Sequence, residues 1–121
     1  WGRIGDSPVI GAGTYADNNS CAVSCTGHGE YFIRHAVAFD VCARYKYLKE
    51  SVEKAADYII HTELNTNAGN GGLIAVDKLG NIAMPYNSGG MFRGFLYKEK
   101  GSPEIKKGCG IGKKIVVVGE K

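Results

Sequence analysis

The chain has 121 residues, of which 44% are hydrophobic and 22% charged, and its formal net charge is +3. This size and composition are typical of one soluble globular domain, and no apolar run reaches the ~18 residues of a membrane-spanning helix. Much of the basic excess lies in the last third without interleaved stacking aromatics, so we predict no membrane and no nucleic-acid partner.

The expected elements, in chain order, place helices between groups of strands. Residues 21–25, 73–76 and 92–97 are apolar or β-branched and predict strands, as do 9–15 and 82–86. Turns are expected at 17–20 and 77–81. Because the strands and helices do not alternate, this order predicts an α+β fold with helices on a largely antiparallel sheet.

Two helices are expected between these strands. The first covers residues 30–48, where apolar residues return at steps of three and four. The second begins after Ser51, a residue type that caps helices well, and runs to residue 64. The apolar residues that define the first helix are Ile33, Val37, Val41, Tyr45 and Leu48.

The cysteines give no metal-site signal. They include no CxxC pair and no cysteine–histidine spacing typical of zinc. We expect reduced thiols packed as small apolar residues in a cytoplasmic protein, and no metal bound by this chain. The four residues are Cys21, Cys25, Cys42 and Cys109.

Three glycine-rich segments are candidates for ligand binding. GAGTYA at 11–16 matches the loose dinucleotide pattern, but a turn and a strand follow it instead of the required helix. TGHGE at 26–30 does precede a helix, and its backbone N–H groups would suit an oxyanion or carboxylate; the alternative is a plain glycine turn. GRIGD at 2–6 places Arg3 and Asp6 three residues apart, which suits the head group of an α-amino acid or, alternatively, a surface ion pair.

Taken together, three segments resemble the β-subunit of the plant-type L-asparaginases, also called isoaspartyl peptidases. They are GRIGDSPVIGAGTYADN at 2–18, SCTGHGE at 24–30 and GGLIAVDKLGNIAMPYNSGGMFR at 71–93. These enzymes are N-terminal-nucleophile hydrolases, and the likeness extends from Gly2 to about Gly94. It implies part of a four-layer αββα sandwich, an α-subunit from the same self-cleaving precursor, and a dimer of αβ pairs.

The resemblance also implies a reaction. In the family, the N-terminal threonine of the β-subunit attacks L-asparagine or a β-aspartyl dipeptide, an acyl-enzyme forms, and water releases L-aspartate. Carried over by motif, Arg3 would bind the substrate α-carboxylate, Asp6 its α-ammonium, and Gly29 would line the head group. Thr26 and Gly27 would form the oxyanion hole. Glu30 would contact Arg3 in a structural or switching role.

Other family parts are expected outside this chain. The nucleophilic threonine lies upstream of GRIGD in the family and is not among these residues, so the chain alone is expected to be inactive. No cofactor is expected here; a structural sodium or an activating potassium would belong to the α-subunit. We expect a single incomplete domain, with a core at 1–97 and a basic tail at 98–121. Glycosylasparaginase-like cleavage and a non-catalytic amino-acid-binding remnant are the alternatives.

Overall fold

The computed structural model describes residues 2–111 and 116–120. The chain divides into two compact units, Trp1–Ser88 and Gly89–Lys121. The boundary between them comes before residue 97, where we expected the core to end, and the expectation of a single domain stays a prediction. Three lysines of the expected basic tail, Lys113, Lys114 and Lys121, lie outside the described residues.

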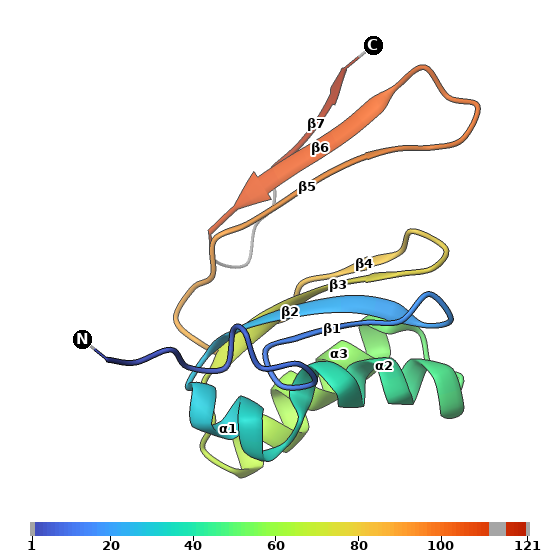
Figure 1. Cartoon of the computed structure of the whole chain (residues 1–121). Coiled ribbons are helices and arrows are strands. Elements are labelled where there is room, and N and C mark those ends of the chain that lie inside the picture. The colour runs from blue at the N-terminus through green and yellow to red at the C-terminus, as the bar shows by residue number, and fades with distance from the viewer. Residues whose placement is uncertain (1, 112–115, 121) are drawn as a thin grey trace. The chain divides into compact units, whose positions relative to one another are not determined.

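The first unit contains a four-stranded antiparallel sheet with helices on one face (Figure 1). Its strands, in spatial order, are β1 (Thr14–Ala16), β2 (Cys21–Gly27), β3 (Gly71–Asp77) and β4 (Ile82–Ala83). Strands β2 and β3 pair along their whole length, with Cys21 opposite Asp77 at one end and Gly27 opposite Gly71 at the other. The predicted antiparallel sheet with two adjacent helical segments is confirmed.

Alternation along the central strands decides which face the helices cover. Val23 and Cys25 of β2 and Leu73 and Ala75 of β3 are buried in one hydrophobic cluster with the helices. On the other face, Ile74 of β3 is 47% exposed. The period of two thus produces one packed face and one open face in this unit.

The prediction of one continuous helix at 30–48 is wrong. The structure has α1 (Gly29–Arg34) and α2 (Val37–Tyr47), separated by Ala36, whose φ of 46° and ψ of 49° are left-handed. The N–H groups of Ala38 and Phe39 donate to carbonyl oxygens of the 11–12 loop at 3.0 and 2.9 Å. These long-range bonds satisfy the start of α2 and redirect the chain, which the local apolar spacing did not indicate.

The break also changes which side chains are buried. Phe32 is fully buried, whereas Ile33, which the spacing placed on the apolar stripe, is 46% exposed. Val37 and Val41 are fully buried as expected, and Leu48 is 62% exposed. The stripe is therefore correct only within α2.

The second expected helix is confirmed from its cap onward. Ser51 accepts a hydrogen bond from the Lys54 N–H at 3.2 Å and begins α3 (Val52–Tyr58). The helix continues as a π-helical segment, η1 (Ile59–Leu64). Its buried side chains complete the cluster against the sheet; they are Val52, Ala55, Ala56, Ile59, Ile60 and Leu64.

Two strand predictions need correction. Residues 9–13 form turns, with the Ala12 and Gly13 N–H groups both donating to the Val9 carbonyl, so only β1 remains of the strand expected at 9–15. The strand expected at 82–86 is shortened to β4, and Tyr86 forms an isolated bridge with Gly72.

The second unit is a three-stranded antiparallel sheet. Its strands are β5 (Arg93–Lys98), β6 (Ile105–Gly110) and β7 (Val116–Glu120), in that spatial order. The strand predicted at 92–97 is confirmed as β5. The lysine- and glycine-rich sequence of β6 has little β-propensity, which is why this strand was not expected.

Candidate functional site

The glycine-rich end of β2 and β3 brings two backbones unusually close together. A Cβ atom at Gly27 would lie 2.3 Å from the Asn70 carbonyl oxygen and 2.6 Å from the Gly71 Cα. Gly27 also has a φ of +146°, which few other residues adopt. A side chain is therefore excluded where the sequence predicted an oxyanion hole.

The Gly27 N–H group has no acceptor on β3. Gly71 donates its own N–H to the Asn87 side-chain oxygen at 2.8 Å, and its carbonyl accepts from the Asn87 N–H at 2.9 Å. Because opposed residues of an antiparallel ladder alternate between bonded and non-bonded pairs, Gly27 and Gly71 form a pair without mutual hydrogen bonds. The Gly27 N–H therefore points away from β3.

Asp6 is a buried carboxylate with an unused oxygen. The residue is 4% exposed, and its Oδ2 has no hydrogen-bond partner among the described residues. A buried ionised oxygen is costly unless it is paired or bound by a ligand. This burial was not predicted from the sequence, which left a surface ion pair with Arg3 as an alternative.

Gly29 lies directly against Asp6. A Cβ atom at Gly29 would be 2.9 Å from Asp6 Oδ1 and 3.0 Å from the Asp6 nitrogen. The Cys25 N–H donates to the Gly13 carbonyl at 2.8 Å, which fixes the loop that carries Asp6 beside the end of β2. Two of the predicted substrate-binding residues, Asp6 and Gly29, are thus brought together.

Arg3, Thr26 and Glu30 are all exposed at this end of the unit. Within residues 2–111, no ion pair joins Arg3 to Asp6 or to Glu30, so the expected contact between Arg3 and Glu30 stays a prediction. By the alternation of β2, Thr26 lies on the face opposite the helices. Its hydroxyl therefore belongs to the open face of the sheet.

The helix start contributes less than expected. Helix α1 has only six residues, and His28 at its N-cap makes no side-chain capping bond. The His28 N–H is already used, because it donates to the Asn70 carbonyl at 2.8 Å. The backbone of Gly27 and the carboxylate of Asp6, rather than a long helix dipole, define the chemistry at this site.

Asn87 is a residue of this site to which the sequence assigned no role. Besides its two bonds to Gly71, its Nδ2 lies 2.7 Å from the Asn65 side-chain oxygen and 3.0 Å from the Gly69 carbonyl. These contacts hold the 65–71 loop beside the end of β2. The available signal was the MPYNSGG stretch of the third segment, where an asparagine precedes a glycine pair.

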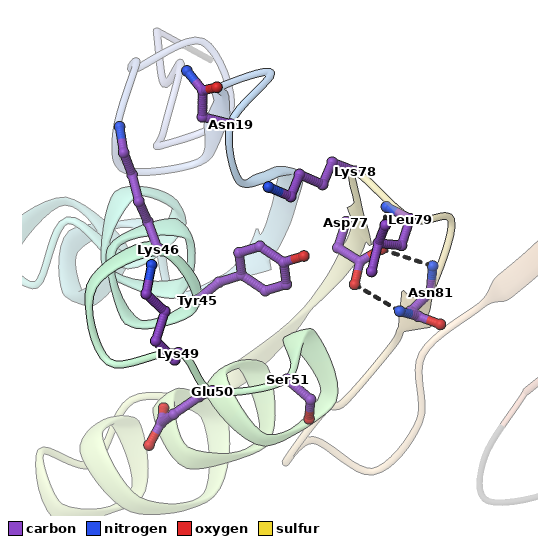
Figure 2. A pocket seen from close by; sticks show the side chains of 10 residues that line it. All are labelled: Asn19, Tyr45, Lys46, Lys49, Glu50, Ser51, Asp77, Lys78, Leu79 and Asn81. Atoms are coloured by element: carbon purple, nitrogen blue, oxygen red, sulfur yellow. Dashed lines mark hydrogen bonds between the residues drawn. The ribbon is translucent and has the colours of Figure 1, made fainter.

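A pocket of about 420 Å³ lies at the opposite end of β2 and β3, and none of the predicted site residues lines it (Figure 2). Its rim carries Lys49 and Lys78, and its side includes the Asp77 turn. Asp77 accepts hydrogen bonds from the Leu79 N–H at 2.8 Å and from both the N–H and the side chain of Asn81. Burial opposes ionisation of Asp77, but these hydrogen bonds outweigh it and hold the pKa of Asp77 below its usual value.

The described residues hold neither a metal-binding cluster nor a membrane-spanning helix. Residues 2–111 and 116–120 contain no cluster of three or more histidine, cysteine or acidic side chains suited to a metal ion. None of the helices in this part of the chain is long and apolar enough to cross a membrane.

Comparison with known proteins agrees with the three sequence segments. A family model described as asparaginase matches residues 1–105. The chain is 51% identical over 96 residues to an isoaspartyl peptidase of Salmonella typhimurium, covering 79% of this chain and 31% of that protein. It is 46% identical over 110 residues to an isoaspartyl peptidase of Escherichia coli, covering 83% of this chain and 34% of that protein.

A human relative, named isoaspartyl peptidase/L-asparaginase, is 42% identical over 90 residues, which cover 74% of this chain and 29% of that protein. The mixed helix and sheet agree with the N-terminal-nucleophile hydrolase fold that this family implies. The chain belongs to the asparaginase family, as the resemblance predicted. It spans about a third of the length of these curated relatives.

Proposed function

We propose that the protein containing this chain hydrolyses L-asparagine and β-aspartyl dipeptides to L-aspartate. Support comes from the family match and from relatives named isoaspartyl peptidase and L-asparaginase. The observation that carries the proposal is the buried Asp6 carboxylate, which has an unpaired oxygen and lies against Gly29. A buried carboxylate beside a glycine backbone favours a small cationic group as its ligand.

The head group of the substrate is bound by two opposite charges. Asp6 accepts hydrogen bonds from the α-ammonium, which supplies the missing partner of its Oδ2. The exposed guanidinium of Arg3, three residues earlier, grips the α-carboxylate with two hydrogen bonds. Gly29 lines the head group, because a side chain at this position would push the head group away from Asp6.

The scissile carbonyl is bound at the end of β2. The Gly27 N–H, which has no acceptor on β3, and the Thr26 hydroxyl on the open face donate to the oxygen that becomes negative in the transition state. Removing one such donor typically costs about 100- to 1000-fold in kcat. The attacking threonine and its α-amine base are supplied by sequence other than these 121 residues.

The open face of the sheet is where the rest of the enzyme packs. Ile74 and Val76 of β3 are 47% and 45% exposed on that face. A second sheet stacked there would bury them and complete an αββα sandwich with the α-subunit. A dimer of such αβ pairs, with any sodium or potassium on the α-subunit, completes the proposed assembly.

The test uses the complete protein and two substrates, L-asparagine and a β-aspartyl dipeptide. We expect release of L-aspartate from both, and no cleavage of glycosylated asparagine. Arg3→Ala is expected to raise KM strongly for both substrates, because the α-carboxylate loses its partner. Absence of aspartate release, or unchanged kinetics in Arg3→Ala, would contradict the proposal.

A further inference from the structure

Two buried cysteine side chains meet between β2 and α2. The Sγ atoms of Cys21 and Cys42 are 2.6 Å apart, and the two residues are only 3% and 2% exposed. The Cys42 thiol also lies 3.2 Å from the Cys21 carbonyl oxygen, which orients it toward the start of β2. A disulfide bond is about 2.05 Å long, so a small movement of either side chain brings the sulfurs to bonding distance.

From this geometry we propose that Cys21 and Cys42 are a redox pair, which a peroxide converts to a disulfide and a thiol reductant restores. The inference is independent of the proposed hydrolysis, because neither cysteine belongs to the glycine-rich end of β2. It also goes beyond the expectation of reduced thiols packed as small apolar residues. Thiols that pack as small apolar side chains describe only the reduced state of this pair.

One of the two sulfurs adjoins a small cavity. A cavity of about 20 Å³ lies beside Cys42, and a space of this size admits about one water molecule. Ser20 lines the same cavity. Lys46 and Asp17, which form an ion pair at 3.1 Å, also line it. Hydrogen peroxide resembles water in size and polarity and fits these surroundings.

The two thiols are not equivalent, and their difference suits a peroxide reaction. The hydrogen bond from the Cys21 thiol lowers the pKa of Cys42, although burial opposes the effect. The same interaction raises the pKa of Cys21. Cys42 also lines the small cavity, whereas Cys21 does not, so we assign the attack on the oxidant to Cys42 and the resolving step to Cys21.

The reaction balances in two steps. The Cys42 thiolate attacks one oxygen of hydrogen peroxide, the O–O bond breaks, and the leaving hydroxide takes a proton to become water. This leaves Cys42 as a sulfenic acid. The Cys21 sulfur then attacks Cys42 Sγ, the S–S bond forms, the S–O bond breaks, and the Cys21 proton leaves with the hydroxyl as a second water.

The cross-link would close a loop around the candidate site. Residues 21–42 include Thr26, Gly27 and Gly29 together with α1. Joining β2 to α2 restricts the unfolded chain over this segment and stabilises the first unit. The oxidised protein is therefore expected to have a higher Tm than the reduced one.

The test is peptide mapping of the complete protein after native oxidation. The protein is treated with hydrogen peroxide, quenched with catalase, denatured, alkylated and digested with trypsin. We expect a peptide of residues 4–34 joined to one of residues 35–44, with Cys25 alkylated, and its loss after dithiothreitol. Full alkylation of Cys21 and Cys42, a link from Cys25 to Cys42, or irreversible oxidation of Cys42 alone would overturn the proposal.

Cys25 offers the matched control on the same strand. It is buried on the same face as Cys21, but burial raises its pKa, and no sulfur contact to it is present among the described residues. Cys25→Ala should keep the cross-linked peptide and the rise of Tm on oxidation, whereas Cys42→Ala should lose both. Should Cys42→Ala fail to fold, the mapping of the unsubstituted protein decides the question alone.

Discussion

Asp6 and Asp77 lie at opposite ends of the paired strands β2 and β3, and both are buried, at 4% and 6% exposed. They differ in their partners. Asp77 receives three hydrogen bonds from its own turn, whereas Asp6 Oδ2 has none among the described residues. Two equally buried carboxylates therefore differ in role: Asp77 is satisfied by its own turn, and the unsatisfied oxygen of Asp6 supports the ligand that we propose for it.

The two ends of β2 and β3 also differ in how closely their backbones are packed. At the Asp6 end, Gly27 and Gly29 let neighbouring backbone and the Asp6 carboxylate approach so closely that no side chain would fit at either position. At the Asp77 end, long side chains such as Lys49 and Lys78 surround an open pocket (Figure 2). The pocket by itself would favour the Asp77 end of the sheet, whereas the unpartnered Oδ2 of Asp6 favours the glycine-rich end that we propose as the site.

The largest effect is expected for Asp6→Asn. This change removes the carboxylate that we propose binds the α-ammonium but keeps the shape, so kcat/KM for both substrates should fall at least about 100-fold, or about 2.7 kcal/mol. The free energy of unfolding should not fall, because the change replaces a buried carboxylate whose Oδ2 has no hydrogen-bond partner among the described residues. Steady-state kinetics and urea unfolding measure the two quantities. Asp77→Asn serves as the matched control, with kinetics within about twofold of the unsubstituted protein.

Asn87→Ala is expected to have the next largest effect. The change leaves the Gly71 N–H and the Gly69 carbonyl without their partner, which loosens the 65–71 loop beside Gly27. We expect a loss of about 2 kcal/mol in unfolding free energy and a drop in kcat that exceeds any change in KM. A change in KM alone would place Asn87 in substrate binding and contradict the positioning role.

Asp77→Asn should reduce stability by about 1–2 kcal/mol at neutral pH, because hydrogen bonds to a charged acceptor are lost. The hydrogen bonds lower the pKa of Asp77 in the folded state. Its stabilisation is therefore complete above the unfolded-state pKa, near 3.8, and is lost as pH falls through the lower folded-state pKa. Unfolding measured from pH 7 to pH 2 should show the two proteins converging in acid. A constant difference over that range would contradict this account.

The smallest effect is expected for Lys49→Ala at the rim of the pocket. The side chain is exposed, so unfolding free energy should change by no more than about 0.5 kcal/mol, and aspartate release should be unchanged. A loss of activity in this variant would show that the lysine-lined end of the sheet takes part in the reaction. The comparison between the two ends would then fail.

Local signals predicted much of the first unit. Residues close together in the sequence determine three of its features, and the structure confirms all three: the cap at Ser51, the alternation of β2 and the glycine-bounded strand β3. The family resemblance brought Asp6 and Gly29 into one site, although neither residue is distinctive alone.

The features that were missed depend on partners distant in sequence. The break at Ala36 results from hydrogen bonds between α2 and the 11–12 loop, and Asn87 acts on a loop 16 residues earlier. The contact between Cys21 and Cys42 likewise joins a strand to a helix across 21 residues. Periodicity and propensity describe only neighbours along the chain, so none of these contacts could be predicted from them.

Calorimetric titration with L-aspartate, the expected product, tests the central claim most directly. We expect the complete protein and Asp77→Asn to bind it with the same Kd, and Asp6→Asn to bind it at least about 100-fold more weakly. Succinate, which has both carboxylates but no ammonium, should bind Asp6→Asn no more weakly than the unsubstituted protein. Equal L-aspartate affinity in Asp6→Asn, or an equal loss in Asp77→Asn, would contradict the assignment of the head-group site to the glycine-rich end of β2.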